Sequence, residues 1–327
     1  MQKVLITQLV PESCVDFLWA QGYEVSHTFD MSEDNICAMA ADVDAILSRG
    51  LKSTARIMDA APKLKIIARF GVGTDMIDMK YAEQKGIWVS ITPEASARSV
   101  AEHTLALLMA CAKRTGAADT HVKQGDWKYR DTVFGCELYG KKLGLVGLGK
   151  IGRLVAEMAK AFGMEIIGYD AYLPEEDWPK DMERAAELAC VFCESDFVSL
   201  HCPLTEQTKN MVDRECLRHM KPGAFLINTA RGELIDEAAL YEALTSRTLR
   251  GAGVDVSRRE PPDANNPLLT LENFVLTPHL AAVTDEAMYR MGIHAAWCID
   301  DVLQGRPPRW PANRPAAREN ILEEERR

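Results

Sequence analysis

Two α/β domains, each built around a doubly wound parallel sheet, are the fold class that the sequence predicts. Its 327 residues suit two compact domains of roughly 150 residues each. Short β-branched runs alternate with helical patterns in two separate series along the chain, which is typical of βαβ units. The crossover helices of such units lie on both faces of the sheet and are nearly always right-handed.

The first series lies within residues 1–98 and supplies four strands. The runs that we assign to these strands are 4–7, 45–47, 65–68 and 87–90. Helical patterns separate the runs, so we expect consecutive strands to be parallel. The sequence therefore predicts a small flavodoxin-like domain in this part of the chain.

A long apolar stretch and a polar stretch lie between the two series. Residues 99–114 are apolar almost all the way round, which predicts a buried or interfacial helix. Residues 124–130 are polar, include Trp127 and show no clear periodicity. We expect an extended arm or a linker there.

The second series contains six strand-like runs, which together predict a complete dinucleotide-binding domain. These runs are 142–146, 165–169, 197–200, 224–228, 253–256 and 274–276. A last helical pattern covers about 285–303. The charged end, residues 318–327, is expected to be frayed.

Composition and charge disfavour several classes of partner. The formal net charge of -10 disfavours nucleic acid and anionic membranes, because neither is attracted to excess carboxylate. The first apolar run is too short for a signal peptide or a membrane span, so we expect a cytoplasmic protein. Nine cysteines, an odd number, suit reduced thiols. Cys190 and Cys193 have no second cysteine pair at a suitable distance, so no metal site is predicted.

A glycine-rich turn opens the second series. Gly147, Gly149 and Gly152 stand between the strand run 143–146 and a helical pattern over 151–162. In this context Gly147 makes the turn, Gly149 lets a pyrophosphate approach the backbone, and Gly152 lets the helix pack on the strand. The motif alone is weak, but its place between a strand and a helix predicts a Rossmann-type dinucleotide site.

The next strand ends at Asp170, eighteen residues after Gly152. A carboxylate at this position accepts hydrogen bonds from the adenine ribose and repels a 2'-phosphate, which favours NAD over NADP. Two alternatives stay open at this point. One is FAD, since phosphate binding does not separate it from NAD, and the other is a turn that has lost its cofactor.

Four further motifs extend the prediction from a cofactor to a reaction. They are 68–75 in the first series and, at the carboxyl ends of later strands, 228–232, 253–256 with Glu260 and Pro261, and 277–282. Ligands sit at such strand ends in doubly wound folds. Over nearly its whole length the chain resembles the D-isomer-specific 2-hydroxyacid dehydrogenases. It is similar to the D-3-phosphoglycerate dehydrogenases among them, in a short form without a regulatory domain.

This resemblance implies a catalytic trio of Arg231, Glu260 and His279. His279 would protonate the alkoxide formed when a 2-keto acid is reduced and would take the proton back in oxidation. Glu260 would hold the ring and stabilise its imidazolium form. Arg231 would bind the substrate carboxylate and polarise the carbonyl oxygen. Hydride would pass between nicotinamide C4 and substrate C2. His103 is interpreted as an interior histidine, and a packing or hydrogen-bonding role is favoured over catalysis for His201.

The resemblance also implies contacts to NAD and to the substrate. Asp255 would accept from the nicotinamide amide, and Val72 and Gly73 would present backbone N–H groups to the substrate carboxylate. Arg49 and Arg69 match binders of a distal phosphate, which suggests a 2-hydroxy acid with a second anionic group, such as 3-phosphoglycerate. The remaining expected cofactor contacts are Lys150, Ile151, Cys202, Pro203, Thr229, Ala230, Arg231, His279 and Ala281.

The domain boundaries follow from the resemblance as well, because in the family the last helix returns to the first domain. We expect a discontinuous substrate domain, residues 1–98 plus 287–327, and a continuous NAD domain, residues 99–286. The active site is expected in the cleft between these domains. A homodimer through the NAD domains is expected, and Trp127 would either reach the partner or pack as a core or interface aromatic.

Two other functions stay open. One is a formate or phosphite dehydrogenase of the same fold, although the formate enzymes pair their histidine with glutamine where Glu260 stands. The other is an NADH sensor without enzymatic activity, such as a transcriptional corepressor of the same fold. Those corepressors keep the catalytic trio, so the motifs do not separate a sensor from an enzyme.

Overall fold

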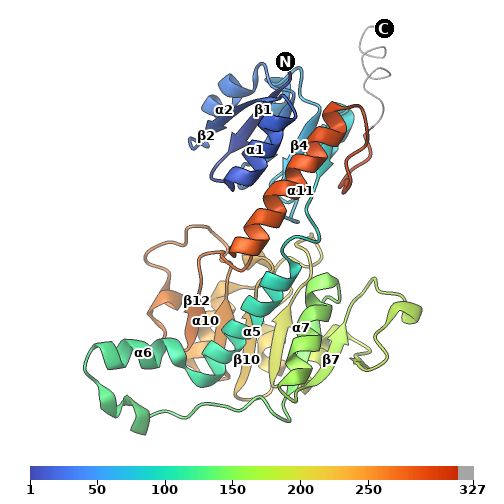
Figure 1. The fold of residues 1–327 in the computed structure, drawn as a ribbon. Helices are drawn as coiled ribbons and strands as arrows, with labels where there is room; N and C mark the ends of the chain where they lie inside the picture. The colour runs from blue at the N-terminus through green and yellow to red at the C-terminus, as the bar shows by residue number, and fades with distance from the viewer. Residues whose placement is uncertain (316–327) are drawn as a thin grey trace. The chain divides into compact units, whose positions relative to one another are not determined.

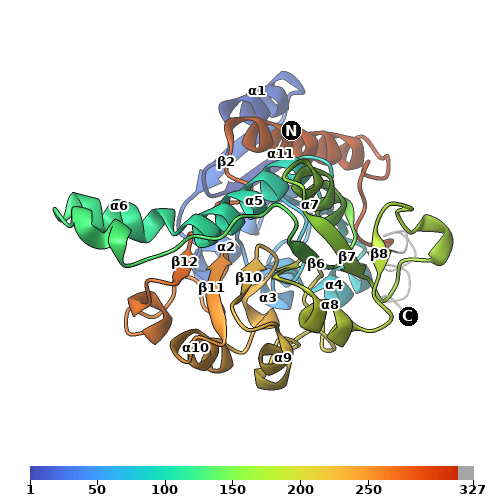
Figure 2. The ribbon, with the colours of Figure 1, turned by 90° about the horizontal axis from the view of Figure 1, so that it is seen from below.

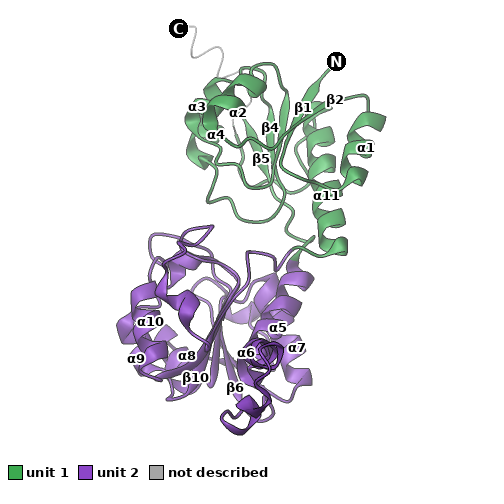
Figure 3. Cartoon of the chain, turned by 90° about the vertical axis from the view of Figure 1, so that its left-hand side faces the viewer, with its two compact units in different colours: residues 1–96, 283–327 green, residues 97–282 purple. Residues whose placement is uncertain are grey.

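The computed structural model describes residues 1–315, and the chain forms two compact units (Figure 3). Unit 1 comprises residues 1–96 and the chain from residue 283 onward, and unit 2 comprises residues 97–282. The charged end, 318–327, lies outside the described residues. Within residues 1–315 no helix is long and apolar enough to cross a membrane.

Unit 1 is built on a five-stranded parallel sheet of order β2-β1-β3-β4-β5, the flavodoxin-like order (Figure 1). Its strands are β1 (Lys3–Thr7), β2 (Glu24–Thr28), β3 (Ala45–Ser48), β4 (Ile66–Arg69) and β5 (Trp88–Ser90). Its helices are α1 (Glu12–Ala20), α2 (Glu33–Ala40), α3 (Ala55–Asp59), α4 (Met79–Gln84) and the late helix α11 (Asp285–Leu303). The apolar runs of β1, β3 and β4 form the buried centre.

The four predicted strands of unit 1 agree with β1, β3, β4 and β5 to within one residue. The sequence missed β2 because this strand contains no apolar run. β2 lies at the edge of the sheet beside β1, and Thr28 is its one buried residue. An edge strand with so little burial shows no hydrophobic pattern in the sequence.

Unit 2 is built on a seven-stranded parallel sheet of order β8-β7-β6-β9-β10-β11-β12. The strands are β6 (Lys142–Val146), β7 (Glu165–Tyr169), β8 (Glu183–Arg184), β9 (Phe197–Leu200), β10 (Ala224–Asn228), β11 (Leu249–Val254) and β12 (Phe274–Leu276). The strand order reverses between β6 and β9, as in the Rossmann fold. A ligand is therefore expected beyond the carboxyl ends of these strands.

Helices cover both faces of this sheet (Figure 2). One face carries α5 (Ala97–Lys113) and α7 (Lys150–Ala161), and the other carries α8 (Leu188–Glu194), α9 (Arg214–His219) and α10 (Glu237–Thr245). Short 3-10 helices stand in the connections: η1 (Trp127–Asp131), η2 (Glu175–Asp177), η3 (Gly232–Leu234) and η4 (Pro267–Thr270). Each face has its own apolar core, which is the doubly wound arrangement that the sequence predicts.

Residues 124–130 are part of the connection between α6 (Thr115–Lys123) and β6, as the linker prediction has it, but they are not extended. Arg114 has a left-handed backbone conformation with φ 57°, which separates α5 from the further helix α6. The 3-10 helix η1 then covers most of the stretch 124–130. α6 buries none of its residues, so it has no apolar stripe from which the sequence predicts a helix.

Two strands of unit 2 also differ from the prediction. β8 has two residues, both exposed at the sheet edge, and the sequence missed it. β11 begins at Leu249 and ends at Val254, so Asp255 and Val256 follow the strand instead of completing it. Asp255 therefore lies at the edge where a ligand is expected.

Candidate active site

The residues predicted for cofactor binding and catalysis in unit 2 gather at one edge of its sheet. All seven strands are parallel, so their carboxyl ends lie at the same edge. Six strands are each followed by a predicted residue: Gly147 after β6, Asp170 after β7, Cys202 after β9, Thr229 after β10, Asp255 after β11 and His279 after β12.

Two glycines of the turn after β6 are required by close backbone contacts. Gly147 has φ 95°, and a Cβ there would lie 2.7 Å from the carbonyl of His201. A Cβ on Gly152 would lie 2.2 Å from Gly147 O. Gly149, which precedes α7, differs because a Cβ there would meet nothing within 4 Å. Open space at the amino end of a helix, whose backbone N–H groups attract anions, fits a pyrophosphate.

Asp170 fixes the glycine turn to the end of β7. Its Oδ2 accepts from Leu148 N at 2.8 Å, and its Oδ1 accepts from Tyr172 N at 2.9 Å and from Leu173 N at 3.1 Å. Each carboxylate oxygen can accept more than one hydrogen bond. A negative charge is thus held beside the turn, with capacity for a further donor on Oδ2.

Arg231 stands in a tight turn after β10. The buried Asn228 fixes this turn, since its Oδ1 accepts from Ala230 N at 2.9 Å and its Nδ2 donates to Arg231 O at 2.8 Å. Thr229 Oγ1 lies 2.9 Å from Thr104 Oγ1 of α5. The guanidinium of Arg231 donates from Nη1 to Ala230 O at 2.6 Å. The turn therefore presents Arg231 from a backbone that is held on both sides.

Glu260 and His279 are in direct contact, with Oε2 of Glu260 2.8 Å from Nδ1 of His279. The other oxygen of Glu260 accepts from Ser257 N at 3.3 Å. His279 has a left-handed backbone with φ 50°, and its N–H donates to Asp255 O at 2.8 Å. Burial raises the pKa of Glu260, but the hydrogen bond and charge of His279 outweigh it, so the pKa lies below its ordinary value. The carboxylate is therefore ionised at neutral pH.

Asp255, which is 1% exposed, holds the segment that follows β12. Its carboxylate accepts from Thr277 Oγ1 at 2.6 Å, from Leu280 N at 2.9 Å and from Ala281 N at 2.8 Å. His103 Nε2 of α5 lies 2.9 Å from Thr277 Oγ1 and 3.4 Å from Asp255 Oδ1. Burial raises the pKa of Asp255, but hydrogen bonds, that of His103 foremost, lower it below its ordinary value. No sequence signal pairs His103 with Thr277, because they are 174 positions apart.

His201 and Cys202 lie after β9 and are unreactive. Nε2 of His201 is 2.9 Å from Ser199 Oγ, and burial lowers the pKa of this histidine to about 4, so its ring is neutral at neutral pH. Burial raises the pKa of Cys202 to about 11, and its thiol faces Met211 Sδ at 3.7 Å. Pro203 follows directly. These residues line the turn without supplying a proton donor or a nucleophile.

Besides Arg231 of unit 2, the predicted substrate-binding residues belong to unit 1, where they stand at the ends of two neighbouring strands or in the loop after β4. Arg49 follows β3, and Arg69 is the last residue of β4. Arg69 donates from Nε to Gly73 O at 3.0 Å and from Nη1 to Ser48 O at 3.2 Å, so it fixes the loop after β4. Arg49 donates from Nη1 to a carbonyl after β1 at 3.0 Å. Val72 is 44% exposed in the loop after β4.

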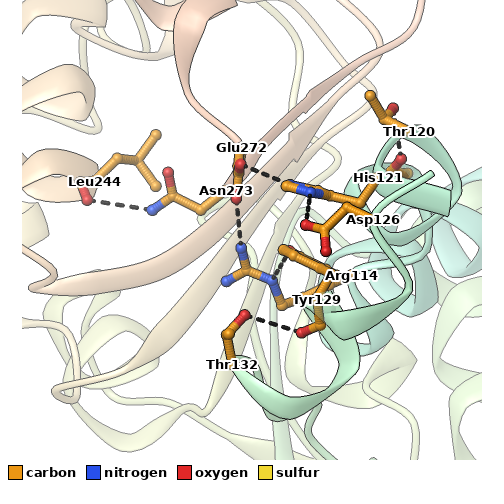
Figure 4. Close-up of polar contacts among 10 residues, drawn as sticks. Arg114, Thr120, His121, Asp126, Tyr129, Thr132, Leu244, Glu272 and Asn273 are labelled. Atoms are coloured by element: carbon orange, nitrogen blue, oxygen red, sulfur yellow. Dashed lines mark hydrogen bonds and ion pairs between the residues drawn. The ribbon is translucent and has the colours of Figure 1, made fainter. Parts of the chain in front are cut away.

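A second polar cluster lies at the opposite, amino-terminal edge of the unit 2 sheet (Figure 4). His121 of α6 lies between two carboxylates, with Nδ1 2.9 Å from Asp126 Oδ2 and Nε2 3.1 Å from Glu272 Oε1. The His121 ring stacks on Tyr129 with centroids 3.9 Å apart. Arg114 donates to Tyr129 Oη at 3.1 Å and to Glu272 Oε2 at 3.3 Å. The hydrogen bond with Glu272 is the largest cause of a raised pKa of His121.

Known proteins match this chain over most of its length. The family model for the NAD-binding domain of D-isomer specific 2-hydroxyacid dehydrogenases matches residues 105–281. A D-3-phosphoglycerate dehydrogenase of Methanocaldococcus jannaschii is 43% identical over 307 residues, which cover 93% of this chain and 58% of that protein. A hydroxypyruvate reductase of Thermotoga maritima is 46% identical over 266 residues, which cover 80% of this chain and 86% of that protein.

Solved structures agree with these matches. The crystal structure of a Thermus thermophilus protein has a TM-score of 0.90 and 36% identity, and the match covers 95% of this chain and 100% of that one. The predicted fold class of two parallel-sheet α/β domains and the predicted cofactor, NAD, are confirmed. The chain spans about 58% of the length of the M. jannaschii relative. It belongs to the D-isomer-specific 2-hydroxyacid dehydrogenase family.

Proposed function

We propose that this chain is an NAD-dependent oxidoreductase that transfers a hydride between nicotinamide and C2 of a D-2-hydroxy acid or its 2-keto acid. The observation that carries the proposal is the 2.8 Å contact between Glu260 Oε2 and His279 Nδ1. Within residues 1–315, Nε2 of His279 makes no hydrogen bond. This nitrogen is therefore available to exchange a proton with a substrate.

The three proposed catalytic residues have separate roles. In reduction, His279 gives its Nε2 proton to the oxygen at C2, and in oxidation it takes that proton back. The ionised Glu260 holds Nδ1–H and stabilises the imidazolium form. Arg231 offers a planar, permanently charged guanidinium that binds the substrate carboxylate and polarises the carbonyl oxygen.

NAD supplies the hydride acceptor or donor when it is bound. The open space at Gly149 supports a pyrophosphate site at the amino end of α7. The carboxylate of Asp170, held beside the turn by Leu148 N, supports NAD over NADP because it repels a 2'-phosphate. Further proposed contacts to the cofactor are Lys150, Ile151, Cys202, Pro203, Thr229, Ala230, Asp255 and Ala281.

The proposed substrate carries a second anionic group, as 3-phosphoglycerate does. Arg49 and Arg69 support this proposal because they place two guanidinium groups at the ends of adjacent strands. The backbone N–H groups of Val72 and Gly73 are proposed to bind the substrate carboxylate. The M. jannaschii relative is named for a phosphorylated substrate and the T. maritima relative for an unphosphorylated one.

Arg49→Ala tests the second anion. This change should lower kcat/KM for phosphohydroxypyruvate about 10- to 100-fold more than for hydroxypyruvate, since it removes a charged hydrogen bond to the phosphate. Arg69→Ala is a less selective change because Arg69 also holds Gly73 O. Equal losses on both acids in Arg49→Ala would overturn the proposal of a second anionic group.

A screen of NADH oxidation tests the activity itself. The 2-keto acids to be offered are glyoxylate, hydroxypyruvate, pyruvate, phosphohydroxypyruvate and 2-oxoglutarate, and NADH loss is followed by absorbance. We expect turnover of at least one acid. Tight NADH binding by fluorescence without turnover of any acid would contradict the proposed activity and favour an NADH sensor.

We also propose a homodimer through the NAD-binding units. Three apolar side chains near α6 and η1 support this, since Val122, Trp127 and Phe134 are 50%, 67% and 83% exposed. Trp127→Asp should shift the chain from dimer to monomer in light scattering at micromolar concentration. A wild-type protein that is monomeric under these conditions would contradict the proposal.

A further inference from the structure

The loop that carries Glu260 borders a pocket. This loop runs over residues 255–266, between β11 and η4. Apolar side chains of α10, β11, η4 and β12 line the pocket, together with Gly232, Ile235, Glu237, Val256, Ser257, Pro262 and Asn266. A loop beside a pocket gains fewer van der Waals contacts on that side. Hydrogen bonds near the two ends of the loop therefore help to fix its position.

One carboxylate makes such hydrogen bonds near both ends. Glu237 Oε1 accepts from Arg258 N at 3.1 Å, and Glu237 Oε2 accepts from Asn266 Nδ2 at 3.1 Å. Arg258 stands near the start of the loop, and Asn266 is its last residue. Asn266 Oδ1 in turn accepts from Leu268 N at 3.1 Å and caps η4. The loop is thus tied to Glu237 on either side of Glu260.

Glu237 stands at the capped amino end of α10. It is the first residue of α10, and the preceding Asp236 caps that helix by accepting from two of its backbone N–H groups. The backbone beside it also touches the loop, since a Cβ on Gly232 would lie 2.1 Å from Ser257 C. Ser257 N then donates to Glu260 Oε1 at 3.3 Å. The contacts run without a gap from the start of α10 to the Glu260 carboxylate.

We infer that Glu237 is a positioning residue, which holds Glu260 Oε2 against His279 Nδ1 by fixing both ends of the loop. The inference rests on the proposed function. In the described part of the chain, residues 1–315, Glu237 makes no hydrogen bond to the Glu260 side chain or to His279, so it acts through the loop. A misplacement of about 1 Å in an active site can lower the rate on the order of 100-fold.

Two variants test the inference. Glu237→Ala removes both ties, and Glu237→Gln removes one, since an amide has a single acceptor oxygen. We expect kcat to fall about 10- to 100-fold in Glu237→Ala and less in Glu237→Gln, with KM for NADH unchanged. Glu242→Ala is the matched control, because Glu242 lies on the same helix and pairs with the exposed Arg214 at 2.5 Å. Equal rates in all four proteins would overturn the inference.

A double-variant cycle separates positioning from a general loss of structure. In a Glu260→Gln background, Glu237→Ala should change kcat less than about twofold, because the group that it positions is already altered. Effects that multiply would show that Glu237 acts on the fold and not through Glu260, and would overturn the inference.

Hydrogen exchange of the peptide 257–266 gives a readout that needs no turnover. Exchange should rise about tenfold in Glu237→Ala and stay unchanged in Glu242→Ala. Unchanged exchange in Glu237→Ala would show that the two hydrogen bonds to Glu237 do not hold the loop in place. A wild-type protein without activity, but with this change in exchange, would overturn the proposed function and leave the tie in place.

Discussion

Strand β12 has a histidine–carboxylate contact at each end, and the two contacts differ in how many ring nitrogens they engage. After the strand, His279 meets Glu260 through Nδ1 only. Before the strand, Glu272 meets His121 through Nε2, while Asp126 meets the same ring through Nδ1. The two histidine–carboxylate contacts thus lie at opposite ends of one strand and leave different ring nitrogens engaged.

The difference in engaged ring nitrogens suits the two histidines to different roles. An imidazole donates hydrogen bonds from both nitrogens only as imidazolium, so two neighbouring carboxylates favour the charged form of the ring. This agrees with the raised pKa of His121, whose largest cause is the hydrogen bond to Glu272. A ring with one carboxylate is oriented and keeps one nitrogen for proton exchange. We therefore expect His279 to act in turnover and His121 to act in folding.

Of the changes considered, His279→Gln should have the largest effect on kcat. A small effect would contradict the difference that we infer between His279 and His121. We expect kcat to fall roughly 10²- to 10⁴-fold, the range lost with a general acid–base group. NADH binding by fluorescence should fall far less than kcat, since the glycine turn is untouched. His121→Gln is the control and should leave kcat unchanged. Similar losses in both variants would show that the two histidines do not differ in the way we infer.

Glu260→Gln should have the next largest effect. We expect kcat to fall roughly 10- to 100-fold, because imidazolium loses its charged partner. The pKa of Glu260 is lowered in the folded chain, so the carboxylate's contribution is complete above the ordinary pKa and is lost as the pH falls through the lowered value. The rates of wild type and variant should therefore converge only at the acid end of a pH profile. A constant ratio across that acid range would contradict this.

Thr277→Val should weaken folding more than chemistry. The change removes the 2.6 Å hydrogen bond that Asp255 accepts and leaves that buried carboxylate with fewer donors. We expect the free energy of unfolding to fall by about 1.5–3 kcal/mol, the range for a hydrogen bond to a charged group. Urea unfolding measures this loss, and Thr245→Val is the control because its hydroxyl bonds within an exposed helix turn. An equal loss in the control would contradict the special weight given to Asp255.

The smallest expected effect concerns the pH dependence of α6 and η1. The pKa of His121 is raised, so its contribution is complete below the ordinary value near pH 6.5 and is lost as the pH rises through the folded value. Hydrogen exchange of residues 115–131, corrected for its intrinsic pH dependence, should therefore increase with pH. His121→Gln should remove this pH dependence, and His219→Gln, at an exposed histidine of α9, should keep it. Persistence of the pH dependence in His121→Gln would contradict this role of His121.

The strands of the two sheets could be predicted from the sequence more completely than the segments that connect them. Buried strands such as β1 and β10 show as apolar runs, whereas β2 and β8 bury too little to show. α6 buries no side chain, so its sequence shows no apolar periodicity from which a helix could be predicted. Helices and strands that pack against a core show an apolar pattern in the sequence, and segments that bury little cannot be predicted from such a pattern.

Part of the candidate site could also be predicted from the sequence. Parallel strands bring their carboxyl ends to one edge, so motifs after separate strands, such as those of Arg231 and His279, could be assigned together. The residues that hold the site residues in place could not be predicted in this way. His103 reaches Thr277 across 174 positions, and Glu237 reaches a loop from another helix, so neither contact follows from spacing or type. Such contacts depend on the packed fold.

The three glycines of the turn after β6 offer unequal tolerance to change. Side chains at Gly147 or Gly152 would collide with backbone, so they would damage the fold together with the site. Gly149 has an ordinary backbone conformation with φ -68°, and a Cβ there meets nothing within 4 Å. A bulky residue at this one position would fill the proposed place of a phosphate while the sheet and helix stay intact. Gly149 is thus the point at which folding and cofactor recognition can be uncoupled.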